Sequence, residues 1–196
     1  MSKVVAVFAM SLDGFIATPD DDVWPLFKWL TGGGTPLAVP GTDRQFMTSA
    51  ASAAHYAELF ETTGAAVTGR RDFDVSKAWG GKYPFDVPAY IVSHTVPPEW
   101  AGEGSPFTFV TGGVESAVAQ AREAAGARNV LVSGSTILQQ SLNAGLLDEL
   151  RIDLVPVLLG SGIRLFNNLQ SAPIELEVTR AVEAPGVTHL RYRVIK

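Results

Sequence analysis

Residues 131–142 read LVSGSTILQQSL, and this stretch changes its periodicity within three residues. Leu131 and Val132 end an apolar run typical of a buried strand, and a helical pattern starts at once after Ser133-Gly134-Ser135. The first turn of a helix carries unpaired N–H groups and about half a positive charge. Small residues let an anion reach those groups. The stretch therefore predicts an α/β fold with an anion-binding turn.

Two other junctions have the same strand–turn–helix form. Gly69-Arg70-Arg71 follows an apolar run at residues 64–69, and Thr111-Gly112-Gly113 follows another at 107–110. Ligands of an open α/β sheet lie beyond the carboxyl ends of its strands. We therefore expect the turns to converge on one elongated ligand with spaced phosphates. One such turn alone is more often only a helix cap, and neither G-x-G-x-x-G nor a Walker loop occurs.

The remaining pattern alternates strands with helices and then ends on strands alone. This order predicts a central, mostly parallel sheet with helices on both faces, closed by an antiparallel C-terminal hairpin that turns at Pro185-Gly186. The expected strands are 3–9, 64–69, 89–93, 107–110, 129–134, 148–160 and two within 174–196; the expected helices are 49–62, 70–79, 114–125 and 135–145. Helix 49–62 should present a small-residue face made of Ala50, Ala53, Ala54, Ala57 and Phe60.

Residues 11–43 are rich in Gly, Pro and Asp and predict a long loop. Loops of this length are often functional lids. Trp24, Phe27 and Trp29 indicate that the loop packs onto another part of the protein, with core packing as the default for aromatic residues.

The amino-acid composition excludes several classes of function. The chain has 196 residues, 46% hydrophobic and 18% charged, with a net charge of −5, which favours one globular domain over 1–196. Its 15 basic residues are scattered, so we expect no nucleic-acid partner. The absence of cysteine excludes disulfides, thiolate metal sites and a Cys nucleophile. No apolar run is long enough to span a membrane, and we expect a cytoplasmic protein.

The three histidines lack the spacing of metal ligands, so the sequence predicts no metal site. His94 directly follows a strand and is expected to border the ligand. His55 and His189 are expected to be structural. Ser133 and Ser135 do not lie in G-x-S-x-G, which disfavours a hydrolase.

Four motifs occur in an order that resembles a known family. They are SLDGFIA (Ser11–Ala17), VTGRRDFD (Val67–Asp74), VSGSTILQQSL (Val132–Leu142) and GLLDELRIDLVPVLLGSGIRLF (Gly145–Phe166). Together they resemble the dihydrofolate reductase-like superfamily, in the branch that contains the reductase domain of riboflavin biosynthesis (RibD C-terminal domain). The resemblance spans nearly the whole chain.

The resemblance implies NADPH as hydride donor, a small pterin- or pyrimidine-like substrate and a homodimer. Ala9, Ile16 and Ala17 would flank the nicotinamide. The phosphate and adenosine contacts would be Gly69, Arg70, Arg71, Ser93, His94, Ser133, Gly134, Ser135 and Thr136. Gly160, Ser161 and Gly162 would lie at the mouth of the substrate site. The proton would come from solvent or from Asp13, although an Asp-Gly pair is more often only a turn.

The sequence departs from the family pattern in places. Serines stand at 133 and 135 where a run of glycines is common, and Asp72 replaces a usual threonine. The Asp72 carboxylate would repel a pyrophosphate unless Arg70 or Arg71 compensates. Helix 49–62 has carboxylates only late, at Glu58 and Glu61, which argues against folate reduction. A nucleotide-binding dimer without catalysis and a nucleoside-phosphate transferase stay open as alternatives.

Overall fold

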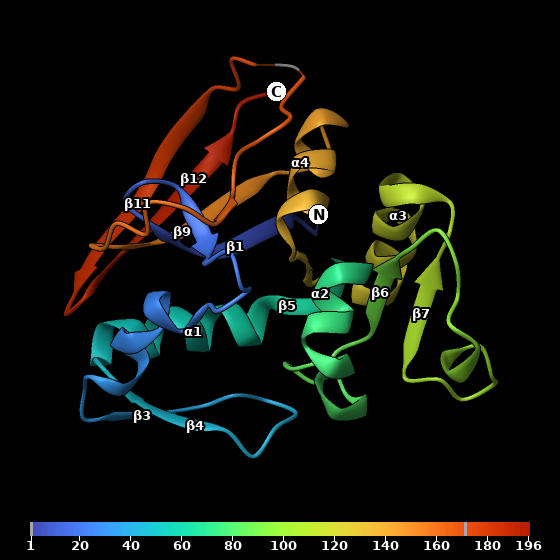
Figure 1. Ribbon diagram of the computed structural model, residues 1–196, viewed down its shortest axis with the longest axis horizontal. Helices are drawn as coiled ribbons and strands as arrows, with labels where there is room; N and C mark the ends of the chain where they lie inside the picture. Colours follow the sequence, from blue (N-terminus) through green and yellow to red (C-terminus); the bar gives the residue numbers. More distant parts are fainter. Residues whose placement is uncertain (1, 171) are drawn as a thin grey trace.

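A computed structural model describes residues 2–170 and 172–196, and its centre is an eight-stranded sheet (Figure 1). The strand order is β11-β12-β9-β1-β8-β5-β6-β7. Neighbouring strands from β9 to β7 are parallel, whereas β12 pairs antiparallel with both β9 and β11. The bounds are β1 Val4–Ser11, β5 Thr63–Gly69, β6 Ala89–Val92, β7 Phe107–Val110, β8 Asn129–Val132, β9 Glu149–Val155, β11 Leu176–Ala184 and β12 Val187–Val194.

In the described part of the chain, four α-helices cover the two faces of the sheet. On one face, α3 (Gly113–Ala125) and α4 (Ser135–Asn143) bury apolar side chains against β1, β5, β8 and β9. On the other face, α1 (Ala50–Thr62) and α2 (Arg70–Val75) contribute Leu59 and Phe73 to a core with β5, β6 and β8. The predicted α/β fold, with a mostly parallel sheet and an antiparallel C-terminal hairpin, is confirmed.

The prediction for the buried face of α1 was wrong. Ala50, Ala54 and Ala57 are exposed, and Ser52 and His55 are buried instead with Ala53 and Leu59. The strands under this part of the helix carry buried polar side chains, among them Asp153 and His189. Polar helix residues turn inward because they meet polar partners there, which an apolar periodicity cannot show.

The long N-terminal loop contains more structure than predicted. Two 3-10 turns, η1 (Trp24–Leu26) and η2 (Lys28–Thr31), precede an antiparallel hairpin of β3 (Thr35–Ala38) and β4 (Gln45–Thr48). The hairpin lies along α1 (Figure 1). Leu26 and Trp29 are buried against Ala9, whereas Trp24 is 47% exposed. The aromatic loop therefore packs onto the end of β1.

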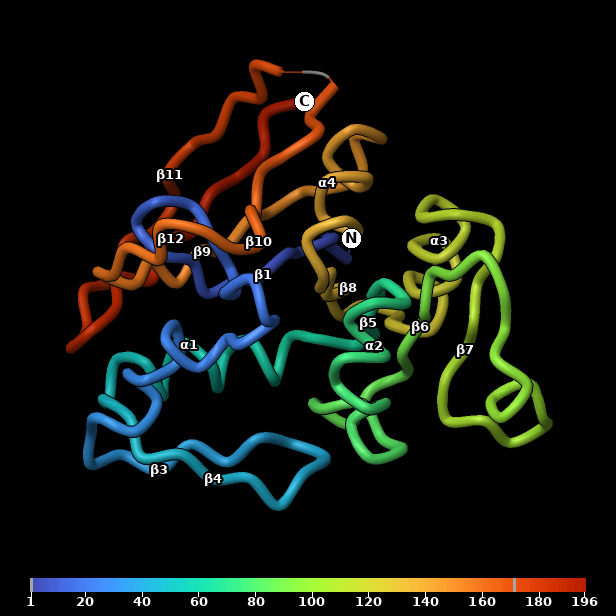
Figure 2. Tube along the Cα trace, in the orientation of Figure 1, coloured from blue at the N-terminus to red at the C-terminus, as the bar shows by residue number. Residues whose placement is uncertain are grey.

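Two short strands connect distant segments near the end of β1. β2 (Phe15–Ala17) pairs antiparallel with β10 (Ile163–Arg164). Both ends of the chain lie near the start of β9 (Figure 2), where Lys3 pairs with Glu149 and Lys196 pairs with Asp148. Within the described residues, no helix is long and apolar enough to cross a membrane.

Candidate functional site

A groove of about 660 Å³ lies at the carboxyl ends of β5, β6, β7 and β8. Parallel strands end at the same edge of a sheet, so the turns that follow them meet. Ten of the predicted site residues line this groove: Ile16, Ala17, Gly69, Arg70, Arg71, Ser93, His94, Gly134, Ser135 and Thr136. The structure adds Asp21, Val23, Asp72, Thr95, Thr111 and Gly113, among others.

The three helix-starting turns predicted to converge all contribute to this groove. Gly69 is the N-cap of α2, and Gly134 is the N-cap of α4 with a φ of +81°. Gly113, with a φ of +87°, begins α3. None of these caps uses a side-chain acceptor, so the first N–H groups of α3 and α4 have no side-chain cap. The groove thus offers backbone donors from separate elements.

Asp72 is held by hydroxyl groups. Its Oδ2 accepts hydrogen bonds from Thr68 Oγ1 at 2.6 Å and from Ser133 Oγ at 3.1 Å. Ser133 is absent from the residues that line the groove, because its side chain points to Asp72. That Ser133 contacts a cofactor stays a prediction.

The two arginines of the first turn bind other carboxylates. Arg70 Nε donates to both oxygens of Asp74 at 2.8 Å, and Arg71 Nη2 donates to Asp21 at 2.9 and 3.0 Å. Among residues 2–170 and 172–196, neither guanidinium pairs with Asp72, so the expected compensation of Asp72 is not found. The Asp21–Arg71 pair joins the N-terminal loop to α2, and both residues line the groove.

Asp13 anchors a turn. Its carboxylate accepts hydrogen bonds from Ser11 Oγ at 2.6 Å and from the backbone N–H groups of Leu159 and Gly160 at 3.1 and 2.7 Å. The hydrogen bond from the Ser11 hydroxyl lowers the pKa of Asp13 most, burial opposes it, and the hydrogen bonds from the Gly160 and Leu159 amides lower the pKa further. Asp13 is therefore ionised at neutral pH and holds no proton to donate.

The remaining predicted contacts lie outside the groove lining. Ala9 is buried beneath Leu26 and Trp29, and Gly160 and Ser161 are exposed in the turn that Asp13 holds. Gly162 has a packing role: a Cβ there would lie 2.0 Å from the Ala17 carbonyl oxygen. Only glycine lets β10 approach β2 this closely, and Ile163 beside it does line the groove.

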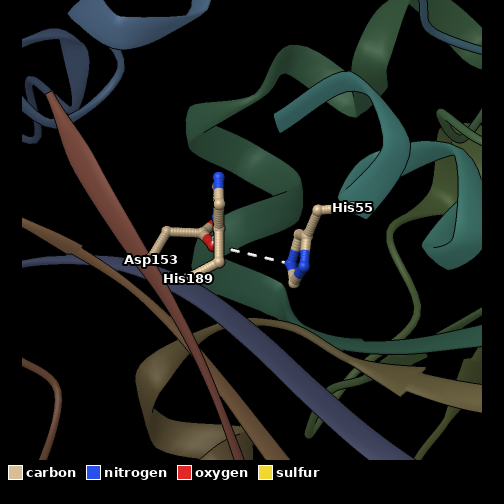
Figure 3. Close-up of side chains that lie close together, drawn as sticks. All are labelled: His55, Asp153 and His189. Carbon is tan, nitrogen blue, oxygen red and sulfur yellow. Dashed lines mark hydrogen bonds and ion pairs between the residues drawn. The ribbon is translucent and has the colours of Figure 1, made fainter. Parts of the chain in front are cut away.

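A second group of polar residues is buried beneath α1. Ser52, His55 and Tyr56 come from α1, Asp153 from β9 and His189 from β12. Figure 3 shows His55, Asp153 and His189. His189 Nδ1 lies 2.6 Å from Asp153 Oδ1, and its Nε2 lies 2.9 Å from Ser52 Oγ. Tyr56 donates to Asp153 Oδ2 at 2.6 Å. We call these five residues the buried polar cluster.

His55 has an unusual environment within this cluster. Its ring stacks on His189 with centroids 4.3 Å apart, and both of its nitrogens are buried without a hydrogen-bond partner in the described part of the chain. Burial lowers the pKa of His55 to about 4, against the attraction of Asp153 and with help from His189, Arg151 and Arg191. The imidazole is therefore neutral at physiological pH.

Sequence reasoning missed this cluster because strand order brings it together. Ala9, Asp153 and His189 are register partners on β1, β9 and β12. Residues 153 and 189 are adjacent only after that pairing is known. A usable signal was Asp153, a carboxylate between Ile152 and Leu154 in the predicted strand 148–160.

The comparisons with known proteins agree with the fold. Residues 2–190 match the model of the RibD C-terminal domain family. YwjB of Bacillus subtilis strain 168, an uncharacterised protein, is 25% identical over 167 residues, which is 85% of this chain and 84% of YwjB.

Two solved structures are similar over the whole chain. A protein of Shewanella sp. PV-4 named for riboflavin biosynthesis has a TM-score of 0.74 at 24% identity, with 100% of both chains covered. A diaminohydroxyphosphoribosylaminopyrimidine deaminase/5-amino-6-(5-phosphoribosylamino)uracil reductase of Thermotoga maritima has a TM-score of 0.66 at 15% identity, covering 99% of this chain and 57% of that chain. At these identities the two structures show a shared fold only. The family is shown by the sequence match over residues 2–190. The chain belongs to the RibD C-terminal domain family.

Proposed function

We propose that the protein is an NADPH-dependent reductase that transfers a hydride to a C=N or C=O group of a small, pterin- or pyrimidine-like molecule. The observation that carries this proposal is the convergence of three helix-starting turns on one groove. A phosphorylated dinucleotide has separated anionic groups, and each is stabilised by backbone N–H donors or cations. Membership of a reductase-like family supports the same class of cofactor.

Different groove residues would bind different parts of the cofactor. In this proposal the turn at Gly134, Ser135 and Thr136 holds the pyrophosphate, because it begins a helix of nine residues with no acidic residue in its first turn. Arg70, Arg71 and His94 surround the 2′-phosphate of the adenosine. Arg71 is shared with Asp21, so a bound phosphate has to compete with that carboxylate.

The nicotinamide end lies toward Ile16, Ala17 and Ile163, which line the groove at β2 and β10. When bound, the cofactor supplies the hydride, and these apolar residues orient its ring and exclude water. Asp13 stays ionised and holds the turn at Gly160, so solvent supplies the proton. The Thermotoga protein is named as a reductase of a phosphoribosylaminouracil, which supports a pyrimidine-like substrate.

A non-catalytic nucleotide-binding dimer is the second candidate, and one observation favours it. Ala9, the residue expected beside the nicotinamide, is 6% exposed and belongs to the same buried apolar cluster as Leu26 and Trp29. In this arrangement the chain's own side chains fill one side of the hydride-transfer position. The homodimer is itself a proposal, supported by the unpaired edge of β11, where Val178 is 61% exposed.

One experiment separates the candidates. NADPH is titrated into the protein, nicotinamide fluorescence reports binding, and loss of NADPH absorbance reports turnover with pterins, pyrimidine ribosylamines and simple carbonyls. The reductase predicts binding and oxidation with at least one substrate class, and binding without any oxidation indicates the second candidate. Binding of ATP or an adenosyl donor in preference to NADPH would contradict the reductase and favour a nucleoside-phosphate transferase. Light scattering should give a mass above the 20.8 kDa of one chain.

A further inference from the structure

The buried polar cluster holds three side chains that can act as metal ligands. His55, Asp153 and His189 each offer one ligand atom, and these atoms lie within 4.8 Å of one another. Their exposed fractions are 3%, 0% and 1%. None of the three lines the cofactor groove. The cluster is therefore a separate feature that the proposed reductase chemistry leaves unused.

The orphaned imidazole of His55 points to a missing partner. Buried polar atoms are nearly always hydrogen-bonded, and each exception in a native structure needs an explanation. Both nitrogens of His55 lack a partner in the described residues, and its Nε2 lies 3.7 Å from Asp153 Oδ1. Because the ring is neutral, a nitrogen lone pair is available without loss of a proton.

We propose that His55, Asp153 and His189 form a binding site for one divalent transition-metal ion, with Zn²⁺ as the first candidate. Two imidazole nitrogens and one carboxylate oxygen are a donor set that Zn²⁺ accepts in proteins. A cation there also compensates the carboxylate of Asp153, which is wholly buried. The ion would join α1 to β9 and β12.

The surrounding residues already orient two of the ligands. His189 Nδ1 lies 2.6 Å from Asp153 Oδ1, so metal binding at Nδ1 requires its proton to move to Nε2, where the N–H can donate to Ser52 Oγ at 2.9 Å. Tyr56 donates to Asp153 Oδ2, which leaves Oδ1 facing both histidines. Outer partners of this kind fix the tautomer and direction of metal ligands.

Metal binding requires a limited rearrangement. Ligand atoms around tetrahedral zinc lie about 3.3 Å apart, so the 3.7 Å between His55 and Asp153 is close, and the 2.6 Å between His189 and Asp153 has to widen. The stacked rings differ by 17°, so the His55 ring must turn toward the ion. This turn breaks no hydrogen bond, because His55 makes none with the described residues.

Two nearby guanidinium groups would repel a metal ion, but each is already paired with carboxylates. The guanidiniums of Arg151 and Arg191 contact Glu58 and Glu149. Trp29 covers the cluster, with its ring centroid 5.3 Å from that of His189. We therefore expect the ion to be loaded most readily during folding.

The test uses the full chain without an affinity tag, refolded in the presence of Co²⁺ and separately of Zn²⁺. After dialysis we expect one metal ion per chain, the visible absorption of low-symmetry Co²⁺, and a raised melting temperature. His55→Ala and His55→Phe should lose the ion, and the second variant keeps an aromatic ring against His189. His94→Ala is the matched control, because His94 lies in the groove, and should retain the ion.

The outcomes are distinguishable from those of the proposed function, because no cofactor is needed. Circular dichroism of the metal-free variants verifies that they fold, which we expect because His55 has no hydrogen bond to lose. Failure of the refolded chain to retain stoichiometric Co²⁺ or Zn²⁺ would overturn the proposal and leave a purely hydrogen-bonded cluster. Retention of the ion by His55→Ala, or its loss in His94→Ala, would also overturn it.

Discussion

The carboxylate of Asp13 accepts the backbone N–H of Gly160 at 2.7 Å, across 147 positions of sequence. The same carboxylate accepts the N–H of Leu159 and the hydroxyl of Ser11. It thereby fixes the segment after β1 to the segment after β9. The Asp-Gly pair of the SLDGFIA motif thus serves as a structural turn.

Replacement of Asp13 by Ala should release that turn. We expect amide hydrogen exchange at Leu159 and Gly160 to accelerate, with Asp13→Asn intermediate because it retains one acceptor oxygen. Folding lowers the pKa of Asp13, so its carboxylate stabilises the folded state fully at any pH above the ordinary pKa near 3.8. This stabilisation is lost as the pH falls through the pKa of the folded protein. Unchanged exchange in Asp13→Ala would show that other contacts hold the turn.

Removal of the carboxylate of Asp21 should strengthen NADPH binding. Asp21→Asn frees Arg71 for a phosphate, and because an exposed ion pair contributes at most about 1 kcal/mol, the gain should not exceed about fivefold. Fluorescence titration measures the dissociation constants. Asp20→Asn is the control, because it removes the same charge from the neighbouring residue. Equal gains in both variants would attribute the effect to net charge alone.

Arg70 should distinguish NADPH from NADH. Arg70→Ala is expected to weaken NADPH by about tenfold more than NADH, because a lost contact to a charged phosphate is worth at least about 1.5 kcal/mol. Arg122→Ala, on α3 and paired with Asp148, is the control and should change neither affinity. Equal weakening of both cofactors by Arg70→Ala would refute a 2′-phosphate contact.

Gly162 should tolerate no side chain. A Cβ at this position meets the Ala17 carbonyl oxygen at 2.0 Å, so β2 or β10 has to move. We expect Gly162→Ala to lower the free energy of unfolding by at least about 2 kcal/mol and to weaken NADPH binding through Ile16 and Ala17. At Gly160, an added Cβ has no neighbour within 4 Å. Gly160→Ala should therefore lower the free energy of unfolding by only about 1 kcal/mol, because the φ of +74° disfavours a side chain. If chemical denaturation gives the two variants similar losses in the free energy of unfolding, Gly162 does not lie against the Ala17 carbonyl.

The helix-starting turns could be predicted from sequence because they are local. Each needs only an apolar run, a small residue and a change of periodicity, as at Gly69, Gly113 and Gly134. Parallel strands then place such turns at one edge, so their convergence followed from the fold class. The groove was predicted for this reason, although Ser133 turned out to bind Asp72.

The parts that could not be predicted depend on distant partners. The β3–β4 hairpin is stabilised by pairing and by packing on α1, which a Gly- and Pro-rich sequence conceals. The inward turn of His55 depends on Asp153 and His189, which join it only through the order β12-β9-β1. The sequence pattern predicts the hairpin of β11 and β12, but it does not show that β12 pairs with β9 or that β9 pairs with β1.

The central claim is that the turns at Gly69, Gly113 and Gly134 form one groove for a phosphorylated dinucleotide. The most direct measurement is a fluorescence titration of the purified chain with NADPH, paired with crystals soaked in it. We predict saturable binding of one NADPH per chain below about 1 mM, with its pyrophosphate density at the start of α4. An absence of binding at that concentration, or density for the cofactor away from these turns, would contradict the account.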